Sequence, residues 1–130
     1  MSPADRWKIL LEKAAQDEYT VDQLIPLPDS PDEVIGFHLQ QAAEKLLKSL
    51  LSFRAVAYRP THNLGELIRL LETHGEPLPT TLDHLRDLTP YATEWRYDYL
   101  PLEGETSLDR NNARQGLHQL RNWVEARLQK

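Results

Sequence analysis

The stretch that decides the fold is residues 35–50, which read IGFHLQQAAEKLLKSL. Its apolar residues recur at intervals of three and four, the spacing of one face of an α-helix. Before it, Ser30 and Pro31 are typical of a helix start, and Glu33 would complete a capping box. We therefore predict a long amphipathic helix over residues 31–56. Its apolar face consists of Ile35, Leu39, Ala42, Ala43, Leu46, Leu47 and Leu50.

The same two signals predict the other helices. A polar residue suited to capping precedes each of them, as Asn63 does before an apolar run. No stretch alternates convincingly enough to predict a strand. The sequence thus predicts an all-α, antiparallel four- to five-helix up-and-down bundle in one domain over residues 1–130, with helices 31–56 and 107–129 at its centre. The remaining expected helices are 3–24, 64–72 and 82–88, the last of which could resume after Pro90.

Composition limits the classes of protein that fit. The 130 residues are 40% hydrophobic and 27% charged, as in ordinary globular proteins. The absence of cysteine excludes disulfide scaffolds, thiol catalysis and Cys-ligated zinc. No apolar run approaches the roughly 20 residues of a membrane span, and residues 1–11 lack the layout of a signal peptide. We therefore expect a cytoplasmic protein that does not associate with a membrane.

The net charge of −5 is unevenly distributed along the chain. A negative overall field excludes a protein that coats nucleic acid indiscriminately. Residues 36–75 and 110–130 are nevertheless net basic, whereas residues 1–35 and 76–109 are net acidic. If the two basic segments meet in the fold, they would form a local cationic seam that binds phosphate selectively. The charge distribution is therefore compatible with a nucleotide or RNA ligand.

The last predicted helix carries a basic face. At about 100° per residue, Arg110, Arg114, His118 and Arg121 fall within roughly 80° of one another. Guanidinium groups suit a phosphate backbone or an acidic partner, and a histidine among arginines tends to stay neutral, as a general base must. The structural alternative is a solvated basic face near a helix C-terminus. Gly116, inside this helix, indicates a close crossing by another helix or by a second subunit, with a tolerated imperfection as the alternative.

Two further clusters could bind a ligand. Helix 31–56 has a polar stripe beside its apolar face, which favours a donor-rich surface for phosphate or for a partner. A solvated face and an interface network are the alternatives. In residues 92–101, ATEWRYDYLP, Arg96 and Tyr97 could hold a phosphate and stack on a base, or could belong to a plug at the end of the bundle. The polar stripe consists of His38, Gln41, Lys45 and Lys48.

Well-known site motifs are missing. The chain has no Gly-Lys-Ser/Thr phosphate loop, no HExxH and no GxSxG. None of the five histidines is paired with another at the i, i+4 spacing that directs two imidazoles at one metal ion. We therefore expect no metal and no cofactor, although ligands from distant elements could still meet.

Three motifs stand out in the chain: residues 37–51 read FHLQQAAEKLLKSLL, residues 61–64 read THNL, and residues 96–98 read RYD. They resemble the second helix, the step into the third helix and the RY segment that together form the signature of the HEPN domain family. The resemblance implies an antiparallel four- to five-helix bundle that usually forms a homodimer. In prokaryotes such domains are often paired with a minimal nucleotidyltransferase as a toxin–antitoxin couple, and many are metal-independent endoribonucleases.

The nuclease motif of that family is an arginine followed, after four to six residues, by a histidine near the start of the last long helix. Here seven residues separate Arg110 from His118, and only three separate Arg114 from His118. A formal match from Arg69 to His74 falls in the wrong helix. The sequence therefore resembles the QQAAEK and RY type of this family. We expect a non-nuclease or weakly active module that dimerises through helices 31–56 and 107–129 and binds a nucleotide, RNA or a nucleotidyltransferase. The expected ligand-binding residues are Gln41, Lys45, His62, Arg96 and Tyr97.

Two alternatives stay open. In a divergent endoribonuclease, His118 would be the general base for attack by a 2′-hydroxyl, and Arg110 or Arg114 would stabilise the charged phosphorane. In the other alternative, the chain is a purely structural dimeric adaptor.

Overall fold

The structure is a computed structural model that describes residues 5–94 and 108–128. All regular elements in these two ranges are helices, and no strand occurs among them. This confirms the all-α fold predicted from the sequence. In chain order the elements are α1 (Arg6–Leu24), α2 (Asp32–Phe53), α3 (Leu64–Thr73), the 3-10 helix η2 (Thr80–Leu88), α4 (Tyr91–Glu94) and α5 (Arg110–Arg127).

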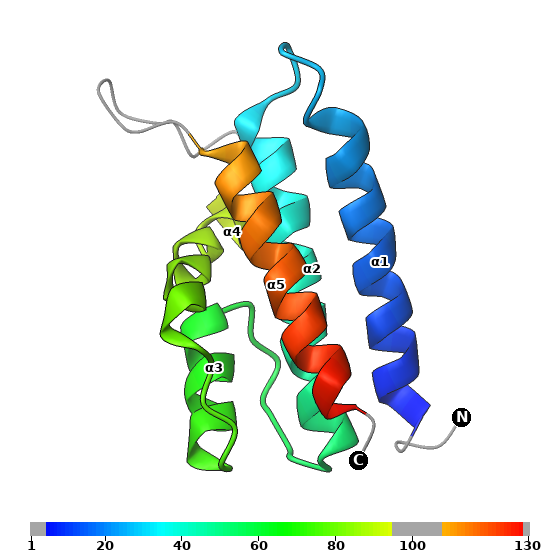
Figure 1. Cartoon of the computed structure of the whole chain (residues 1–130), viewed down its shortest axis with the longest axis vertical. Coiled ribbons are helices and arrows are strands. Elements are labelled where there is room, and N and C mark those ends of the chain that lie inside the picture. The colour runs from blue at the N-terminus through cyan, green and yellow to red at the C-terminus, as the bar shows by residue number, and fades with distance from the viewer. Residues whose placement is uncertain (1–4, 95–107, 129–130) are drawn as a thin grey trace.

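The central element is α2, which contacts α1, α3, η2, α4 and α5. Figure 1 shows α1 running antiparallel to α2 and α5, so these three long helices form one half of the bundle. The shorter α3 runs in the same direction as α2, because the extended segment 54–63 first carries the chain back along the bundle (Figure 1). Residues 54–63 therefore run along the bundle from the end of α2 to the start of α3 as an extended segment and not as a helix.

The core is built on the apolar face of α2. All seven apolar positions predicted for that face are buried, and Leu39, Leu46 and Leu50 have no exposed surface. Removing such side chains from water contributes about 2 kcal/mol each. In contrast, α1 buries only a few residues, and two of them, Asp17 and Glu18, are acidic. The surface of α1 that faces the bundle is therefore partly polar.

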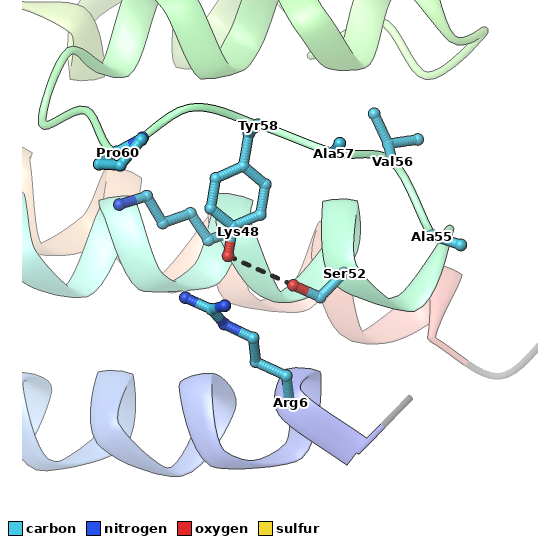
Figure 2. Close-up of a pocket in the computed structure, with 8 residues that line it drawn as sticks. All are labelled: Arg6, Lys48, Ser52, Ala55, Val56, Ala57, Tyr58 and Pro60. Carbon is cyan, nitrogen blue, oxygen red and sulfur yellow. Dashed lines mark hydrogen bonds between the residues drawn. The ribbon is translucent and has the colours of Figure 1, made fainter. Parts of the chain in front are cut away.

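The end of α2 corrects the sequence prediction, because the helix stops at Phe53 and does not continue to Val56. Ala55 has a φ of 59°, and the N–H groups of Ala55 and Val56 donate to carbonyls in the last turn. This is a Schellman ending, whose left-handed residue is usually glycine, as Gly75 is at the end of α3. An alanine in that position gives no sequence signal. Figure 2 shows the chain turning at Ala55 and returning along α2.

The segment predicted as an α-helix over residues 82–88 is instead a 3-10 helix. Its buried residues are Leu82, Leu85 and Leu88, and this spacing of three matches the three residues per turn of a 3-10 helix. The short α4 then begins directly after Pro90, where the sequence indicated that a helix could resume.

Two helix starts depend on capping side chains. The Oδ1 atom of Asn63 accepts the N–H of Glu66 at 3.2 Å, which confirms the predicted start of α3. The start of α5 lies later than predicted, because Asp109 caps the helix by accepting the N–H of Asn112 at 3.1 Å. The first residue of α5 is therefore Arg110.

Ser30 does not cap α2, which corrects the expected capping box. Pro31 immediately precedes the helix, and no side chain caps it. The Ser30 hydroxyl instead donates to the carbonyls of Leu24 and Leu27, at 2.8 and 2.7 Å. It thus closes the turn between α1 and α2.

Gly116 allows η2 to approach α5 closely. A Cβ atom at this position would lie 2.5 Å from Nε2 of His84, so any other residue here would require the His84 side chain to move. The predicted close crossing is therefore made by another helix of the same chain. Within the described residues, that His84 nitrogen is buried without a hydrogen-bond partner, while Nδ1 donates to the carbonyl of Thr81 at 3.1 Å.

Candidate functional site

The basic face predicted on the last helix is present on α5, but its arginines are ion-paired with α1. Arg114 donates to both carboxylate oxygens of Asp22, through Nε at 2.6 Å and Nη2 at 3.1 Å. Arg121 donates to Glu18 through Nε at 2.7 Å and also through Nη2. The Nη1 atom of Arg114 lies 3.5 Å from Glu18 as well. One buried carboxylate therefore joins two guanidinium groups.

These ion pairs keep both guanidinium groups charged and compensated. The hydrogen bond to Asp22 is the main reason that the pKa of Arg114 is raised. Burial alone would lower the pKa of Arg121, but hydrogen bonds to Glu18 and Glu125 raise it overall. The positive charge of this face is therefore balanced by carboxylates, most of them on α1. The segment charges led us to expect a cationic seam, but on this face of α5 the charges of Arg114 and Arg121 are compensated by ion pairs.

Arg110 connects the start of α5 to the turn between α1 and α2. Its Nε atom donates to Asp32 at 2.7 Å, and Nη1 donates to the Ser30 hydroxyl at 3.0 Å. Its Nη2 atom donates to the carbonyl of Ser30. All three arginines of the predicted basic face thus have a carboxylate partner within the fold.

His118 lies one helical turn from both Arg114 and Arg121 on α5. Its side chain is exposed, and it forms no hydrogen bond or ion pair with any described residue. Arg114, His118 and Arg121 therefore lie on one face of α5, as helical periodicity predicted. The two arginines bind carboxylates of α1, whereas the imidazole of His118 is exposed to solvent.

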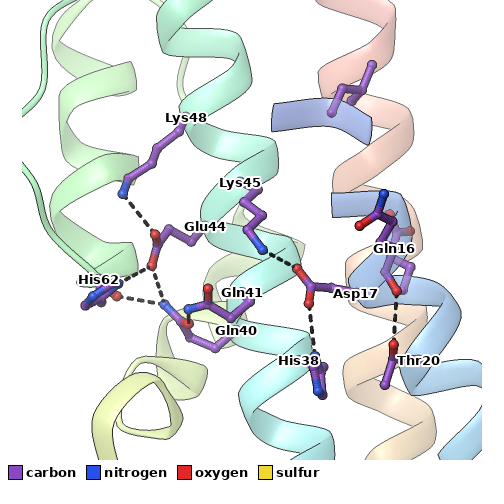
Figure 3. A network of polar contacts seen from close by, with 12 residues as sticks. Gln16, Asp17, Thr20, His38, Gln40, Gln41, Glu44, Lys45, Lys48 and His62 are labelled. Carbon is purple, nitrogen blue, oxygen red and sulfur yellow. Dashed lines mark hydrogen bonds and ion pairs between the residues drawn. The ribbon is translucent and has the colours of Figure 1, made fainter. Parts of the chain in front are cut away.

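The polar stripe predicted on α2 is divided into two parts. In the first, Nδ1 of His38 and Nζ of Lys45 both donate to Asp17 of α1, at 2.9 and 2.6 Å (Figure 3). Asp17 is only 9% exposed, and its carboxylate oxygens can only accept. Lys45, one of the expected ligand-binding residues, is therefore engaged in an ion pair that fixes α1 to α2.

The second part of the stripe belongs to a buried network around Glu44 (Figure 3). Lys48 donates to Oε2 of Glu44 at 2.9 Å, while His62 and Gln40 donate to Oε1 at 2.8 and 3.0 Å. Gln40 is fully buried; it also donates to the carbonyl of His62 at 2.9 Å and accepts from Gln41 at 2.7 Å. We call these five residues the Glu44 network.

The Glu44 network has a structural role. Burial alone would raise the pKa of Glu44, but hydrogen bonds from Lys48, Gln40 and His62 lower it below its ordinary value. The carboxylate is thus charged and surrounded by donors. Because His62 precedes α3 and Glu44 belongs to α2, their hydrogen bond joins the segment before α3 to α2. Gln41 and His62, both expected to bind a ligand, are part of this connection. The His62 side chain nevertheless remains 56% exposed.

Sequence reasoning missed the carboxylates that organise these contacts. Asp17, Glu18 and Glu44 are all buried. A signal for the α1–α5 pairing does exist, because Glu18 and Asp22 lie four residues apart on one face of α1. That acidic face matches the basic face of α5. Arg96 and Tyr97, also expected to bind a ligand, lie outside the described residues.

Comparison with protein-family models matches residues 8–129 to the HEPN domain. This chain belongs to the HEPN domain family. The matched region includes every described helix apart from the first two residues of α1. Comparison with curated proteins and with solved structures finds no match.

In this HEPN domain, two of the three motifs that carry the resemblance are joined by the Glu44 network. Residues 37–51 form most of α2, and residues 61–64 lead into α3. The third motif, residues 96–98, lies outside the described residues. Within residues 5–94 and 108–128, no three His, Asp or Glu side chains gather closely enough to hold a metal ion, and no helix is long and apolar enough to cross a membrane.

Proposed function

We propose that this chain is a cytoplasmic, dimeric HEPN module that acts by binding and does not cleave RNA. Its partner in this proposal is a minimal nucleotidyltransferase, with which it forms a prokaryotic toxin–antitoxin pair. The observation that supports a binding role is the ion pairing of α5, because Arg110, Arg114 and Arg121 are all engaged by carboxylates of the same chain.

A nuclease needs a cationic donor that is free when negative charge develops on the phosphorane. Here an incoming phosphate would have to displace Asp22 from Arg114 or Glu18 from Arg121, and Glu18 would become a buried, unpaired charge if it lost both Arg121 and its 3.5 Å contact with Arg114. Leaving such a charge without a partner costs several kcal/mol. The spacing between Arg110 and His118 supports the same conclusion, since it exceeds the spacing of the family's nuclease motif.

The outer face of α5 supports dimerisation. Its exposed side chains include Asn111, Gln115, Gln119 and Asn122, together with His118. Uncharged polar groups cost less to remove from water than charged ones, and charged residues are depleted from the centres of interfaces. We therefore assign this face of α5 to contact with a second copy of the chain.

The dimer is tested by placing charge on this face. We expect Gln115→Glu combined with Gln119→Glu to convert a dimer to a monomer in analytical ultracentrifugation. The matched control is Gln16→Glu, on the exposed side of α1. If the wild-type chain is monomeric at every concentration, or if the double variant stays dimeric, the assignment of this face is wrong.

Binding without cleavage is tested with purified protein and total RNA in EDTA. We expect no cleavage that depends on His118, so wild type and His118→Ala should behave alike. Cleavage that His118→Ala abolishes would instead establish the second candidate, a divergent endoribonuclease. The feature that favours this candidate is the exposed imidazole of His118, which is free of described partners and could accept a proton.

The partner is tested through the neighbouring gene. If that gene encodes a minimal nucleotidyltransferase, we expect the two proteins to copurify after co-expression. Thermal shift measurements with ATP, GTP and short RNA test the remaining ligand classes, a nucleotide or RNA. No copurification and no shift with any of them would leave the chain as a purely structural dimeric adaptor.

A further inference from the structure

A cavity of about 560 Å³ opens between the start of α1, the last turns of α2 and the returning segment 54–63. Figure 2 shows Arg6 reaching into it from α1, Lys48 and Ser52 from α2, and Tyr58 from the returning segment. This cavity involves none of the residues of the α5 basic face. The described residues that line it are Arg6, Lys48, Ser52, Ala55, Val56, Ala57, Tyr58 and Pro60.

Two cationic side chains, Arg6 and Lys48, line the cavity, and no carboxylate lines it among the described residues. None of its described lining residues is acidic, and the Arg6 guanidinium forms no ion pair with any described residue. Arg6 lies 5.8 Å from the centroid of the Tyr58 ring, and Lys48 lies 5.5 Å from it, so the aromatic ring helps to hold both cations at the cavity. The charge of Arg6 is therefore available to a ligand, whereas the charge of Lys48 is shared with Glu44, which lies outside the lining of the cavity.

The donors of the cavity exceed its acceptors. Lys48 uses one of its three N–H donors on Glu44 at 2.9 Å, which leaves two for another acceptor. The guanidinium of Arg6 offers five more donors. The hydroxyl oxygens of Ser52 and Tyr58 lie 3.4 Å apart. When one hydroxyl donates its proton to the other, the second hydroxyl can still donate its own proton to a ligand. A suitable ligand must therefore be rich in acceptors and negatively charged.

These donors come from three elements and approach from different directions, as Figure 2 shows. Such an arrangement suits the tetrahedral phosphate group better than the planar carboxylate, which is recognised by donors in one plane. The volume is within the range of about 300–1,000 Å³ that is typical of small-molecule sites, and it exceeds what a phosphate group fills. The walls formed by Val56, Ala57 and Pro60 are available to contact the rest of the ligand.

We propose that this cavity binds a small phosphomonoester, with Arg6, Lys48 and the hydroxyls of Ser52 and Tyr58 around its phosphate. This inference rests on the proposed binding role and gives it a site and a class of ligand. The phosphate could belong to a nucleotide or to a sugar phosphate, because the recognising groups are the same for both.

The test is a titration of the full chain with adenosine 5′-monophosphate and with glucose 6-phosphate, followed by amide NMR, with adenosine as the uncharged control. We expect at least one phosphomonoester to shift the amides of residues 55–58, and adenosine to leave them unchanged. Arg6→Gln should weaken binding at least about tenfold, since it removes a charge-assisted contact. Binding of only one phosphomonoester would support the proposal and identify the source of the phosphate.

The matched control is Lys13→Gln, which removes one exposed positive charge from the same helix outside the cavity. It should change the affinity less than about twofold if the effect of Arg6 is local. Tyr58→Phe keeps the aromatic ring and removes one donor, so we expect weaker binding with an unchanged fold.

Two results would overturn the inference. One is equal affinity of wild type and Arg6→Gln, and the other is the absence of any shift at residues 55–58 with either phosphomonoester. If the chain still dimerises and copurifies with a partner in that case, the cavity inference alone has failed. If the cavity binds a phosphomonoester but no dimer or partner is found, the proposed partnership has failed and the site remains.

Discussion

The basic face of α5 and the cavity beside Arg6 both contain cationic side chains, but they differ in what lies opposite. The guanidinium groups of α5 face Glu18 and Asp22 of α1, which neutralise them within the fold. Arg6 faces an aromatic ring and two hydroxyls, with no acidic residue among the described lining of the cavity. The comparison teaches that cations grouped by the sequence can be fully compensated within the fold, as Arg114 and Arg121 are, whereas the charge of Arg6 is not compensated by any described carboxylate.

The largest expected effect comes from Glu18→Gln. It removes the buried carboxylate that Arg114 and Arg121 share, and breaking a buried ion pair typically costs about 3–5 kcal/mol. We expect a loss of about 3 kcal/mol in the free energy of unfolding, measured by urea denaturation at pH 7. The control is Asp22→Asn, whose side chain is half exposed and should cost less than about 1 kcal/mol. Equal effects of the two variants would mean that the burial of Glu18 is unimportant.

The next effect concerns Glu44→Gln, which replaces the charged acceptor of Lys48 and His62 with a neutral amide. We expect a loss of about 2 kcal/mol at pH 7, because charge-assisted hydrogen bonds become weaker and one donor faces an amide N–H. The measurement is again the free energy of unfolding in urea.

The same variant makes a pH prediction. The pKa of Glu44 is lowered in the folded chain, so its stabilisation is fully present above the ordinary value of 4.5 and is lost as the pH falls through the folded pKa. The stability of wild type should therefore decrease more steeply below about pH 4.5 than that of Glu44→Gln. Parallel pH profiles for the two proteins would contradict a lowered pKa.

Ala55→Gly should have a smaller and opposite effect. Ala55 lines the cavity beside Arg6 and has a positive φ, a conformation that glycine adopts without the steric cost of a Cβ atom. We expect a gain of about 0.5–1 kcal/mol, seen as a higher melting temperature. A gain with unchanged phosphomonoester binding would sharpen the comparison, because it would show that the rim can be stabilised without altering the donors.

Arg6→Gln should have the smallest effect on stability. Because Arg6 is exposed and has no carboxylate partner in the described part of the chain, we expect a change below about 0.5 kcal/mol. A loss comparable to that of Glu18→Gln would mean that Arg6 is a structural cation like those of α5, and the contrast between the two regions would disappear. The measurement is urea denaturation beside Lys13→Gln.

Local signals in the sequence were sufficient to predict most of the fold. The apolar spacing predicted the buried face of α2, and Asn63 marked the start of α3. The end of α2 could not be predicted, because Ala55 occupies a position where glycine is the usual signal. A spacing of three leucines is compatible with an α-helix and with a 3-10 helix, so periodicity alone could not distinguish the two forms for η2.

The candidate site was less predictable, for a physical reason. Periodicity places Arg114 and His118 on one face of α5, but it contains no information about which helix packs there. The ion pairs of Arg114 and Arg121 depend on α1, about a hundred residues earlier in the chain. Arg6 carried no sequence signal at all, because its role in the cavity depends on a return of the chain after α2 that Ala55 permits.

The distance along the chain between α1 and α5 also has a consequence for the order of folding. The pairs from Asp17 to α2 span 21 and 28 residues, whereas those from Asp22 and Glu18 to α5 span 92 and 103. Closing the longer loop costs more entropy, so α1 and α2 should associate first and α5 should dock late. Contacts that form after the transition state control the rate of unfolding, so Glu18→Gln should unfold faster in stopped-flow measurements and refold at nearly the wild-type rate.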